Sequence, residues 1–211
     1  MLYFHRTPKV LEWFYPGLTW HMGRAGNEVF LTFDDGPVPE MTPEILELLR
    51  TNNVPATFFC VGDNVRKHPG ILKEVVGEGH AVGNHTFHHI SGWSVSSDSY
   101  CEEVAACDSI LGDNGIQTSL FRPPYGKISK SQARRLLKDG RKIIMWDVLT
   151  ADFDRSLSWS QCLERTTKHI RPGSIIVLHD NPKARERTIA LLPRLIEYIK
   201  AENLKCSLIP Y

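Results

Sequence analysis

The sequence lacks long apolar runs and an excess of charge of either sign. No stretch approaches the roughly 18 consecutive apolar residues of a membrane span, so no span is predicted. The 25 Lys and Arg residues nearly balance the 24 Asp and Glu residues and leave a net charge of +1. Because nucleic acids and anionic membranes attract proteins through excess positive charge, we expect neither as a partner.

Cysteine is also scarce and irregularly spaced. Its five copies include no C-x-x-C pair, so the sequence indicates neither a disulfide framework nor a thiolate zinc site, and we expect buried, reduced thiols. Arg6, Lys9 and Glu12 interrupt the apolar positions that a signal peptide would need. The sequence as written therefore predicts a cytoplasmic protein, whereas a leader preceding it would place the protein outside the cytoplasm.

The length of 211 residues suits one α/β domain with a short extension before it. Residues 1–28 are rich in aromatics without regular spacing, and we expect them to pack as an irregular cap on the rest; membrane contact is the weaker alternative. Residues 29–211 alternate short apolar runs with amphipathic stretches, which is typical of βα units around a parallel sheet. Strands are expected at 29–33, 56–61, 81–83, 119–121, 142–148, 174–178 and 205–208.

Capping signals and apolar spacing place helices between several of these strands. Thr42 followed by Pro43 predicts a helix start, and Ser129 with Gln132 has the spacing of a capping box. Apolar residues recur on one helical face in two more stretches, 100–111 and 189–199. Seven strands with intervening helices fit either a barrel or an open sheet.

Two adjacent carboxylates follow the first expected strand. Asp34 and Asp35 precede Gly36 and Pro37, at the carboxyl end of the strand, where α/β folds build their sites. Adjacent acids repel one another unless a cation or a proton separates their roles. A plain surface turn is the alternative, because Asp, Gly and Pro are common turn residues.

A histidine cluster follows the strand expected at 81–83. His85 and His89 are four positions apart and can converge from a helical turn or a tight loop, and imidazole is a preferred zinc ligand. A carboxylate with two histidines leaves coordination open for water, as in catalytic zinc sites. His88 is an alternative to His89, and a polar loop with incidental histidines is the alternative to any metal site.

Two further polar motifs follow later strands. Arg122 begins the sequence Arg-Pro-Pro-Tyr-Gly, and its guanidinium can hold a carboxylate through paired hydrogen bonds. Gly126 allows a turn there whose amides can point into a pocket. His179 ends the apolar run 174–178. A lone histidine there is often structural, but a metal-dependent hydrolase needs an acid for its leaving group.

In this order the motifs resemble those of the polysaccharide deacetylases, also called the NodB-homology domain or carbohydrate esterase family 4. The resemblance covers about residues 28–208 and rests on residues 32–36, 85–89, 122–126 and 177–179. It implies a distorted, TIM-like (β/α) barrel with about seven parallel strands. It also implies one divalent metal, namely zinc with cobalt or nickel as alternatives, bound by Asp35, His85 and His89.

The resemblance further implies the roles of the other site residues. Asp34 is the implied general base and Arg122 orients it. The amide of Tyr125 helps to bind the oxyanion, and His179 protonates the departing amine.

The family's fourth motif is altered in this sequence. Leu149 stands in place of its first Asp and Phe153 in place of its Trp, whereas Asp152 remains and is available to orient His179. We expect these two replacements to change the apolar wall of the site, and so to affect which substrate is bound more than whether the protein is active. Phe153 and Trp93 are candidates to stack on sugar rings, with a place in the core as the alternative for either.

These residues predict a metal-dependent hydrolase that removes N-acetyl groups, by cleaving a non-peptide carbon–nitrogen bond, from a chitin-like or peptidoglycan-like polymer or oligomer. The acetylated carbohydrate is the expected partner. An O-acetyl (xylan) esterase and a deacetylase of a small non-sugar amide are the alternatives. A non-catalytic carbohydrate-binding module ranks last, because it would be expected to have lost Asp34 or His179. An aspartyl-phosphate phosphatase is disfavoured because its acids are two positions apart.

Overall fold

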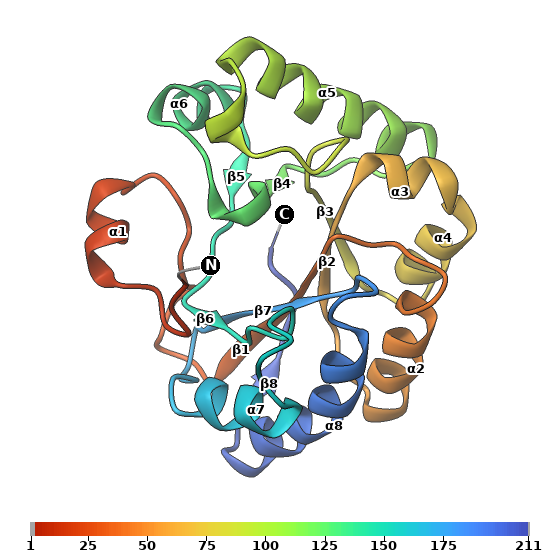
Figure 1. The fold of residues 1–211 in the computed structure, drawn as a ribbon, viewed down its shortest axis with the longest axis vertical. Helices are drawn as coiled ribbons and strands as arrows, with labels where there is room; N and C mark the ends of the chain where they lie inside the picture. Colours follow the sequence, from red (N-terminus) through yellow and green to blue (C-terminus); the bar gives the residue numbers. More distant parts are fainter. Residues whose placement is uncertain (1–2, 211) are drawn as a thin grey trace.

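A curled sheet of parallel strands, ringed by helices, forms the centre of the molecule (Figure 1). The computed structural model describes residues 3–210. Seven strands are neighbours in the order β5 (Lys142–Ile143), β4 (Leu120–Phe121), β3 (Ala81–Asn84), β2 (Thr57–Cys60), β1 (Glu28–Asp34), β7 (Ile175–His179) and β6 (Val148–Leu149). A further strand, β8 (Lys205–Cys206), pairs with the start of β1. The predicted distorted (β/α) barrel is confirmed, in the form of a curled half-barrel.

Strand β1 lies in the middle of the sheet and shows how the sequence builds both sides of it. Successive side chains of a strand point to opposite faces. Leu31 joins the main core, together with residues of the surrounding helices, whereas Phe30 joins a smaller core within the curled sheet. Thr32 and Asp34 both bond to Arg122. The second face of β1 therefore leads directly into the polar site.

The helices surround the strands in Figure 1. They are α2 (Thr42–Asn52), α3 (Gly62–Lys67), α4 (Pro69–Gly77), α5 (Ser97–Asp113), α6 (Lys130–Lys138), α7 (Trp159–Thr167) and α8 (Arg185–Ala201). The predicted capping box of Ser129 and Gln132 begins α6. The predicted face of α5 is buried at Tyr100, Val104, Cys107 and Leu111. Helices α3, α4 and α7 were not predicted, although Ser158 and Gln161 form a capping box at the start of α7 like that of α6.

The expected single strand 142–148 is wrong. The chain forms two short strands, β5 and β6, and the residues between them belong to neither strand. The N-terminal segment forms backbone hydrogen bonds with this stretch. The Thr19 amide donates to Ile143 O at 2.9 Å and the Leu149 amide donates to His5 O at 2.9 Å. Isolated bridges join Thr19 to Ile144 and Arg6 to Val148. The N-terminal segment thus lines the side of the half-barrel between β5 and β6.

The N-terminal segment is more ordered than the expected irregular cap, because it contains helix α1 (Lys9–Phe14). Its aromatic side chains divide into two groups: Trp20 is buried, whereas Trp13 is 77% exposed. All five cysteines are free, as expected; three of them are buried, Cys60, Cys107 and Cys162. Among residues 3–210, we find no helix with the length and apolar character that crossing a membrane requires.

Candidate active site

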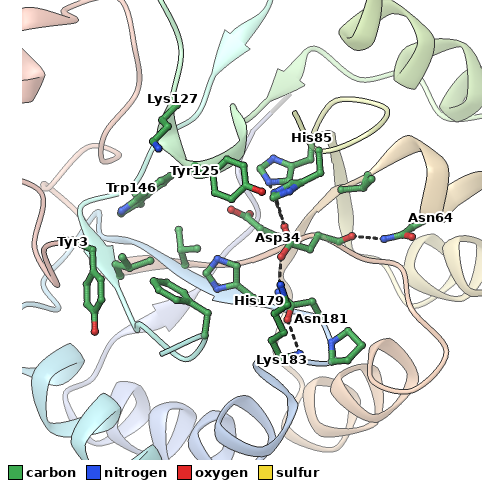
Figure 2. A pocket seen from close by; sticks show the side chains of 17 residues that line it. Tyr3, Asp34, Asn64, His85, Tyr125, Lys127, Trp146, His179, Asn181 and Lys183 are labelled. Carbon is green, nitrogen blue, oxygen red and sulfur yellow. Dashed lines mark hydrogen bonds and ion pairs between the residues drawn. The ribbon is translucent and has the colours of Figure 1, made fainter. Parts of the chain in front are cut away.

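The loops after β1, β3, β4 and β7 meet in one cleft of about 780 Å³ (Figure 2). They meet because parallel strands place their carboxyl ends at the same edge of a sheet. Each loop contributes polar or aromatic side chains to the lining: Asp34, Asp35, His85, His89, Tyr125, Lys127, His179 and Asn181. Arg122 and Asp152 are fully buried behind this lining.

Backbone strain is concentrated around this cleft. Seven non-glycine residues of the described chain 3–210 have positive φ, and five of them belong to the site loops: Asp35, Thr86, His89, Tyr125 and Ala151. The left-handed conformation costs an ordinary residue about 1–2 kcal/mol. Such strain persists only where the surrounding structure fixes it, which is common in functional sites.

Asp35, His85 and His89 form a compact group of three possible metal ligands. Their ligand atoms all lie within 4.8 Å of one another. The Oδ1 atom of Asp35 is 3.0 Å from His89 Nε2 and 3.6 Å from His85 Nε2. Burial alone would raise the pKa of Asp35, but the two histidines hold that pKa well below its usual range.

The surroundings of this group fit a divalent metal. The Nδ1 atom of His85 is 2.7 Å from Arg122 O, so Nδ1 donates there and Nε2 is the ring nitrogen that faces Asp35 and could bind a metal. The side-chain Nδ2 atom of Asn181 donates to Asp35 Oδ2 at 2.5 Å, and Oδ1 is directed at the histidines. Two imidazole nitrogens and one carboxylate oxygen are the donor set of an open zinc site.

The structure places His89, and not His88, in this group. His88 is on the outer side of the loop, where its Nδ1 atom is 2.8 Å from Glu103 Oε1 and its side chain is 61% exposed. His89 packs edge-on against the Tyr125 ring, with 4.6 Å between the ring centroids. His89 has a φ of 55°, and its Nε2 atom faces Asp35.

Asp34 and its neighbour Asp35 have different partners: Asp34 pairs with Arg122, whereas Asp35 faces the two histidines. The Arg122 Nη1 atom donates to Asp34 Oδ1 at 2.6 Å and to Thr32 Oγ1 at 2.7 Å. The guanidinium also lies over the Phe59 ring, 4.1 Å from its centroid. Burial lowers the pKa of Arg122 and the Asp34 charge opposes that change. The second oxygen of Asp34 remains available on the cleft side.

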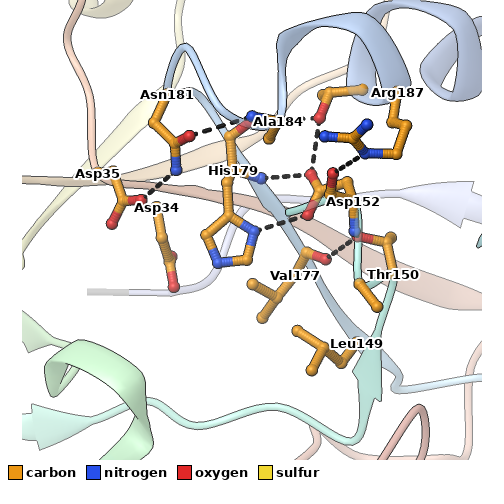
Figure 3. A network of polar contacts seen from close by, with 12 residues as sticks. Asp34, Asp35, Leu149, Thr150, Asp152, Val177, His179, Asn181, Ala184 and Arg187 are labelled. Carbon is orange, nitrogen blue, oxygen red and sulfur yellow. Dashed lines mark hydrogen bonds and ion pairs between the residues drawn. The ribbon is translucent and has the colours of Figure 1, made fainter. Parts of the chain in front are cut away.

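Asp152 holds His179 through two hydrogen bonds (Figure 3). Its Oδ1 atom is 2.7 Å from His179 Nδ1, and its Oδ2 atom accepts the His179 amide at 2.8 Å. Thr188 Oγ1 also donates to Oδ2, at 2.7 Å. Burial alone would lower the pKa of His179, but Asp152 outweighs it and raises the pKa to about 10. This pairing leaves Nε2 as the ring nitrogen that can serve the cleft.

Tyr125 lies in the short 3₁₀ turn η2 (Pro124–Gly126) with φ of 59°. The amides that follow it are used within the turn, since Gly126 donates to Pro123 O and Lys127 to Pro124 O, both at 3.0 Å. The Tyr125 side chain is 53% exposed and forms part of the cleft wall.

Asp180 has a positioning function that the sequence reasoning missed. Its Oδ1 atom accepts the Gly36 amide at 2.7 Å and its Oδ2 atom accepts the Thr42 hydroxyl at 2.8 Å. The predicted helix does begin at Thr42, with Pro43 in its first turn, but its N-cap is Met41. The prediction that Thr42 is the cap is therefore wrong, and its hydroxyl bonds Asp180 instead. The position of Asp180 directly after His179, at a strand end, was the available signal.

The other wall of the cleft is apolar and includes both altered positions of the fourth motif. Leu149 and Phe153 line the cleft together with Tyr3. Phe153 packs edge-on against His179 at 5.2 Å and against Tyr3 at 5.4 Å. The Tyr3 hydroxyl donates to Asp154 at 2.5 Å. Nothing in the sequence singled out Tyr3, because its place depends on a contact 151 positions away.

The fold and the site agree with the family comparison. Residues 22–144 match the family model described as polysaccharide deacetylase. The chain therefore belongs to the polysaccharide deacetylase family.

Named relatives and a solved structure support this membership. A peptidoglycan-N-acetylglucosamine deacetylase of Bacillus cereus is 35% identical over 87% of this chain and 67% of its own length. A chitooligosaccharide deacetylase of Sinorhizobium fredii is 32% identical over 82% of this chain and 86% of its own length. A crystal structure of a peptidoglycan N-acetylglucosamine deacetylase, in complex with 4-naphthalen-1-yl-N-oxidanyl-benzamide, superposes with a TM-score of 0.90 at 32% identity, covering 95% of this chain and 94% of that one.

Proposed function

We propose that the protein hydrolyses the N-acetyl groups of a chitin-like or peptidoglycan-like sugar polymer or oligomer and uses one divalent metal. The observation that carries this proposal is that one cleft holds both a candidate base and a candidate acid, each with its own charged partner. Asp34 is paired with Arg122, and His179 is paired with Asp152. An amide needs both groups, because water must lose a proton and the departing nitrogen must gain one.

Asp35, His85 and His89 would hold the metal, with zinc as the best match to their donor set and cobalt or nickel as alternatives. When bound, a metal of this class polarises a carbonyl and lowers the pKa of its water to about 7. The relatives named above are deacetylases of peptidoglycan N-acetylglucosamine and of chitooligosaccharides, which supports an acetylated sugar as the substrate.

The chain's own residues divide the proton transfers between them. Asp34 takes the proton of the attacking water, while Arg122 keeps the carboxylate oriented. The Tyr125 amide donates to the carbonyl oxygen as negative charge develops there, and one such donor contributes roughly 3 kcal/mol in other enzymes. His179 then donates a proton from Nε2 to the nitrogen of the leaving amine, held in place by Asp152.

Acetate release from N-acetylglucosamine oligomers tests the proposal. The wild type should release acetate, and His179→Ala should lose this activity far more than hydrolysis of an activated acetyl ester, because an activated oxygen leaves without an acid. His68→Ala, outside the cleft, is the matched control. Efficient deacetylation of xylan without N-deacetylation would support an O-acetyl esterase instead. Binding of the oligomers without any acetate release would support a carbohydrate-binding module.

A further inference from the structure

An exposed group of two aromatic rings and one lysine lies beside the cleft. Trp93 is 66% exposed and Tyr125 is 53% exposed. The Lys127 Nζ atom is 5.4 Å from the centroid of the Trp93 ring and 5.9 Å from that of the Tyr125 ring. Lys127 and Tyr125 also line the cleft (Figure 2). We call Trp93, Tyr125 and Lys127 the rim cluster.

Hydrogen bonds hold the rim cluster in place although it is exposed. The Trp93 Nε1–H group donates to Ile128 O at 3.2 Å. The Gly92 amide donates to Lys127 O at 3.0 Å, so the Trp93 loop and the Lys127 loop are tied directly to each other. A further bond ties the Trp93 loop to helix α6, because the Gln132 Nε2 atom donates to Gly92 O at 2.7 Å. A large exposed ring with a fixed orientation is typical of a binding surface, since its burial contributes little to folding.

The charges around the cleft favour an anionic group near Lys127. Among residues 3–210, neither Lys127 nor Lys183, which also lines the cleft, has a carboxylate within ion-pair distance. Figure 2 shows these two lysines on opposite sides of the cleft. The acidic side chains of the cleft are already engaged, Asp34 by Arg122 and Asp35 by two histidines. A substrate carboxylate would therefore meet positive charge that no protein carboxylate neutralises at the rim.

We propose that the rim cluster is a second sugar subsite, which binds a carboxylate-bearing sugar next to the residue that loses its N-acetyl group. The aromatic faces that Lys127 does not cover can stack on the C–H face of a sugar ring, and the Lys127 ammonium pairs with the carboxylate. A neutral polymer such as chitin would offer this ammonium no carboxylate in addition to its two aromatic contacts. The inference rests on the proposed function and narrows its substrate to a copolymer that alternates N-acetylated and acidic sugars.

The carboxylate can be part of the ring, as in a uronic acid, or lie on an ether substituent, as in a lactyl sugar. Two substrate arms distinguish these sources: oligosaccharides alternating N-acetylglucosamine with glucuronic acid, and peptide-free strands alternating N-acetylglucosamine with its lactyl ether. Each arm is paired with the same oligosaccharide after its carboxylates have been converted to methyl amides. Acetate release gives kcat/KM for each member of a pair, and calorimetric titration gives its Kd.

At least one carboxylated substrate should exceed its amidated counterpart by about tenfold, the effect of one charge-assisted contact. The carboxylated and amidated substrates should differ in KM and Kd, and the ratio of their kcat/KM values should decrease at high salt. This ratio should fall toward one in Lys127→Gln and recover in Lys127→Arg. Lys130→Gln is the matched control, because Lys130 lies over Phe14 and Tyr15 instead. Equal affinity for carboxylated and amidated oligosaccharides in both arms would overturn the inference. A Lys127→Gln variant with an unchanged preference would also overturn it. If no acetate is released from any substrate, the proposed function fails, and the Kd comparison still decides whether the subsite exists.

Discussion

The Asp180 carboxylate lies against the backbone of Gly36 so closely that no side chain fits there. Its Oδ1 atom accepts the Gly36 amide at 2.7 Å, and a Cβ atom on residue 36 would lie 1.8 Å from its Oδ2 atom. This contact ties the end of β7 to the turn after β1. The position of that turn decides which way Asp34 and Asp35 face.

Two replacements of Asp180 should show whether its hydrogen bonds or its charge hold the turn in place. Burial raises the pKa of the Asp180 carboxyl well above its usual range, so a neutral amide of the same shape should be tolerated in Asp180→Asn. Asp180→Leu leaves the Gly36 amide and the Thr42 hydroxyl unpaired, which should cost about 2–4 kcal/mol of unfolding free energy. Metal affinity should also fall roughly 10-fold or more. Urea unfolding and metal titration measure the two effects, and equal losses in both variants would contradict this account.

The group of Asp35, His85 and His89 predicts different effects for two neighbouring histidines. Purified wild-type protein should bind about one zinc-class ion per chain, and a chelator should remove its activity reversibly. His89→Ala should lower metal affinity by a large factor, because it removes one of three ligands. His88→Ala is the matched control, since that ring pairs with Glu103. Elemental analysis and calorimetry provide the measurement, and the reverse order of the two variants would reassign the ligand.

Asp34→Asn should separate chemistry from metal binding. The amide keeps the shape of the side chain but cannot take a proton, so turnover should fall about 100-fold or more. Metal content should stay at the wild-type level because Asp34 is paired with Arg122 and not with the histidines. Retained turnover would assign the base to another residue.

The His179–Asp152 pair predicts how stability depends on pH. The folded pKa of His179 is raised to about 10, above the usual 6.5, mainly by Asp152 acting against burial, with Asp35 and Asp34 adding to it. The stabilisation is therefore complete below pH 6.5 and is lost as the pH rises toward 10, by up to about 1.4 kcal/mol per pH unit. Denaturant unfolding of metal-free protein should show this decline in the wild type relative to His179→Gln. Parallel pH dependences for the two proteins would disprove the assignment.

The sequence predicted the residues at strand ends better than the contacts between distant segments. The four motifs lie at the carboxyl ends of β1, β3, β4 and β7, a rule that follows from parallel strands alone. Apolar spacing likewise predicted the buried face of α5. By contrast, the division of 142–148 into β5 and β6 depends on backbone bonds to residues near 5 and 19, which no local pattern records. Thr42 shows the same difference, because the capping rule is local and its bond to Asp180 is not.

The bonds between the N-terminal segment and residues 143–154 also bear on the order in which the protein forms during synthesis. Tyr3 donates to Asp154 across 151 positions, and the Leu149 amide donates to His5 O. Because a ribosome releases the chain from its N-terminal side, Tyr3 and His5 lack these partners until Leu149 and Asp154 have been made. One wall of the cleft is therefore completed only after several strands of the sheet have been synthesised, and Tyr3 and His5 reach their final positions later than many residues that follow them in the chain.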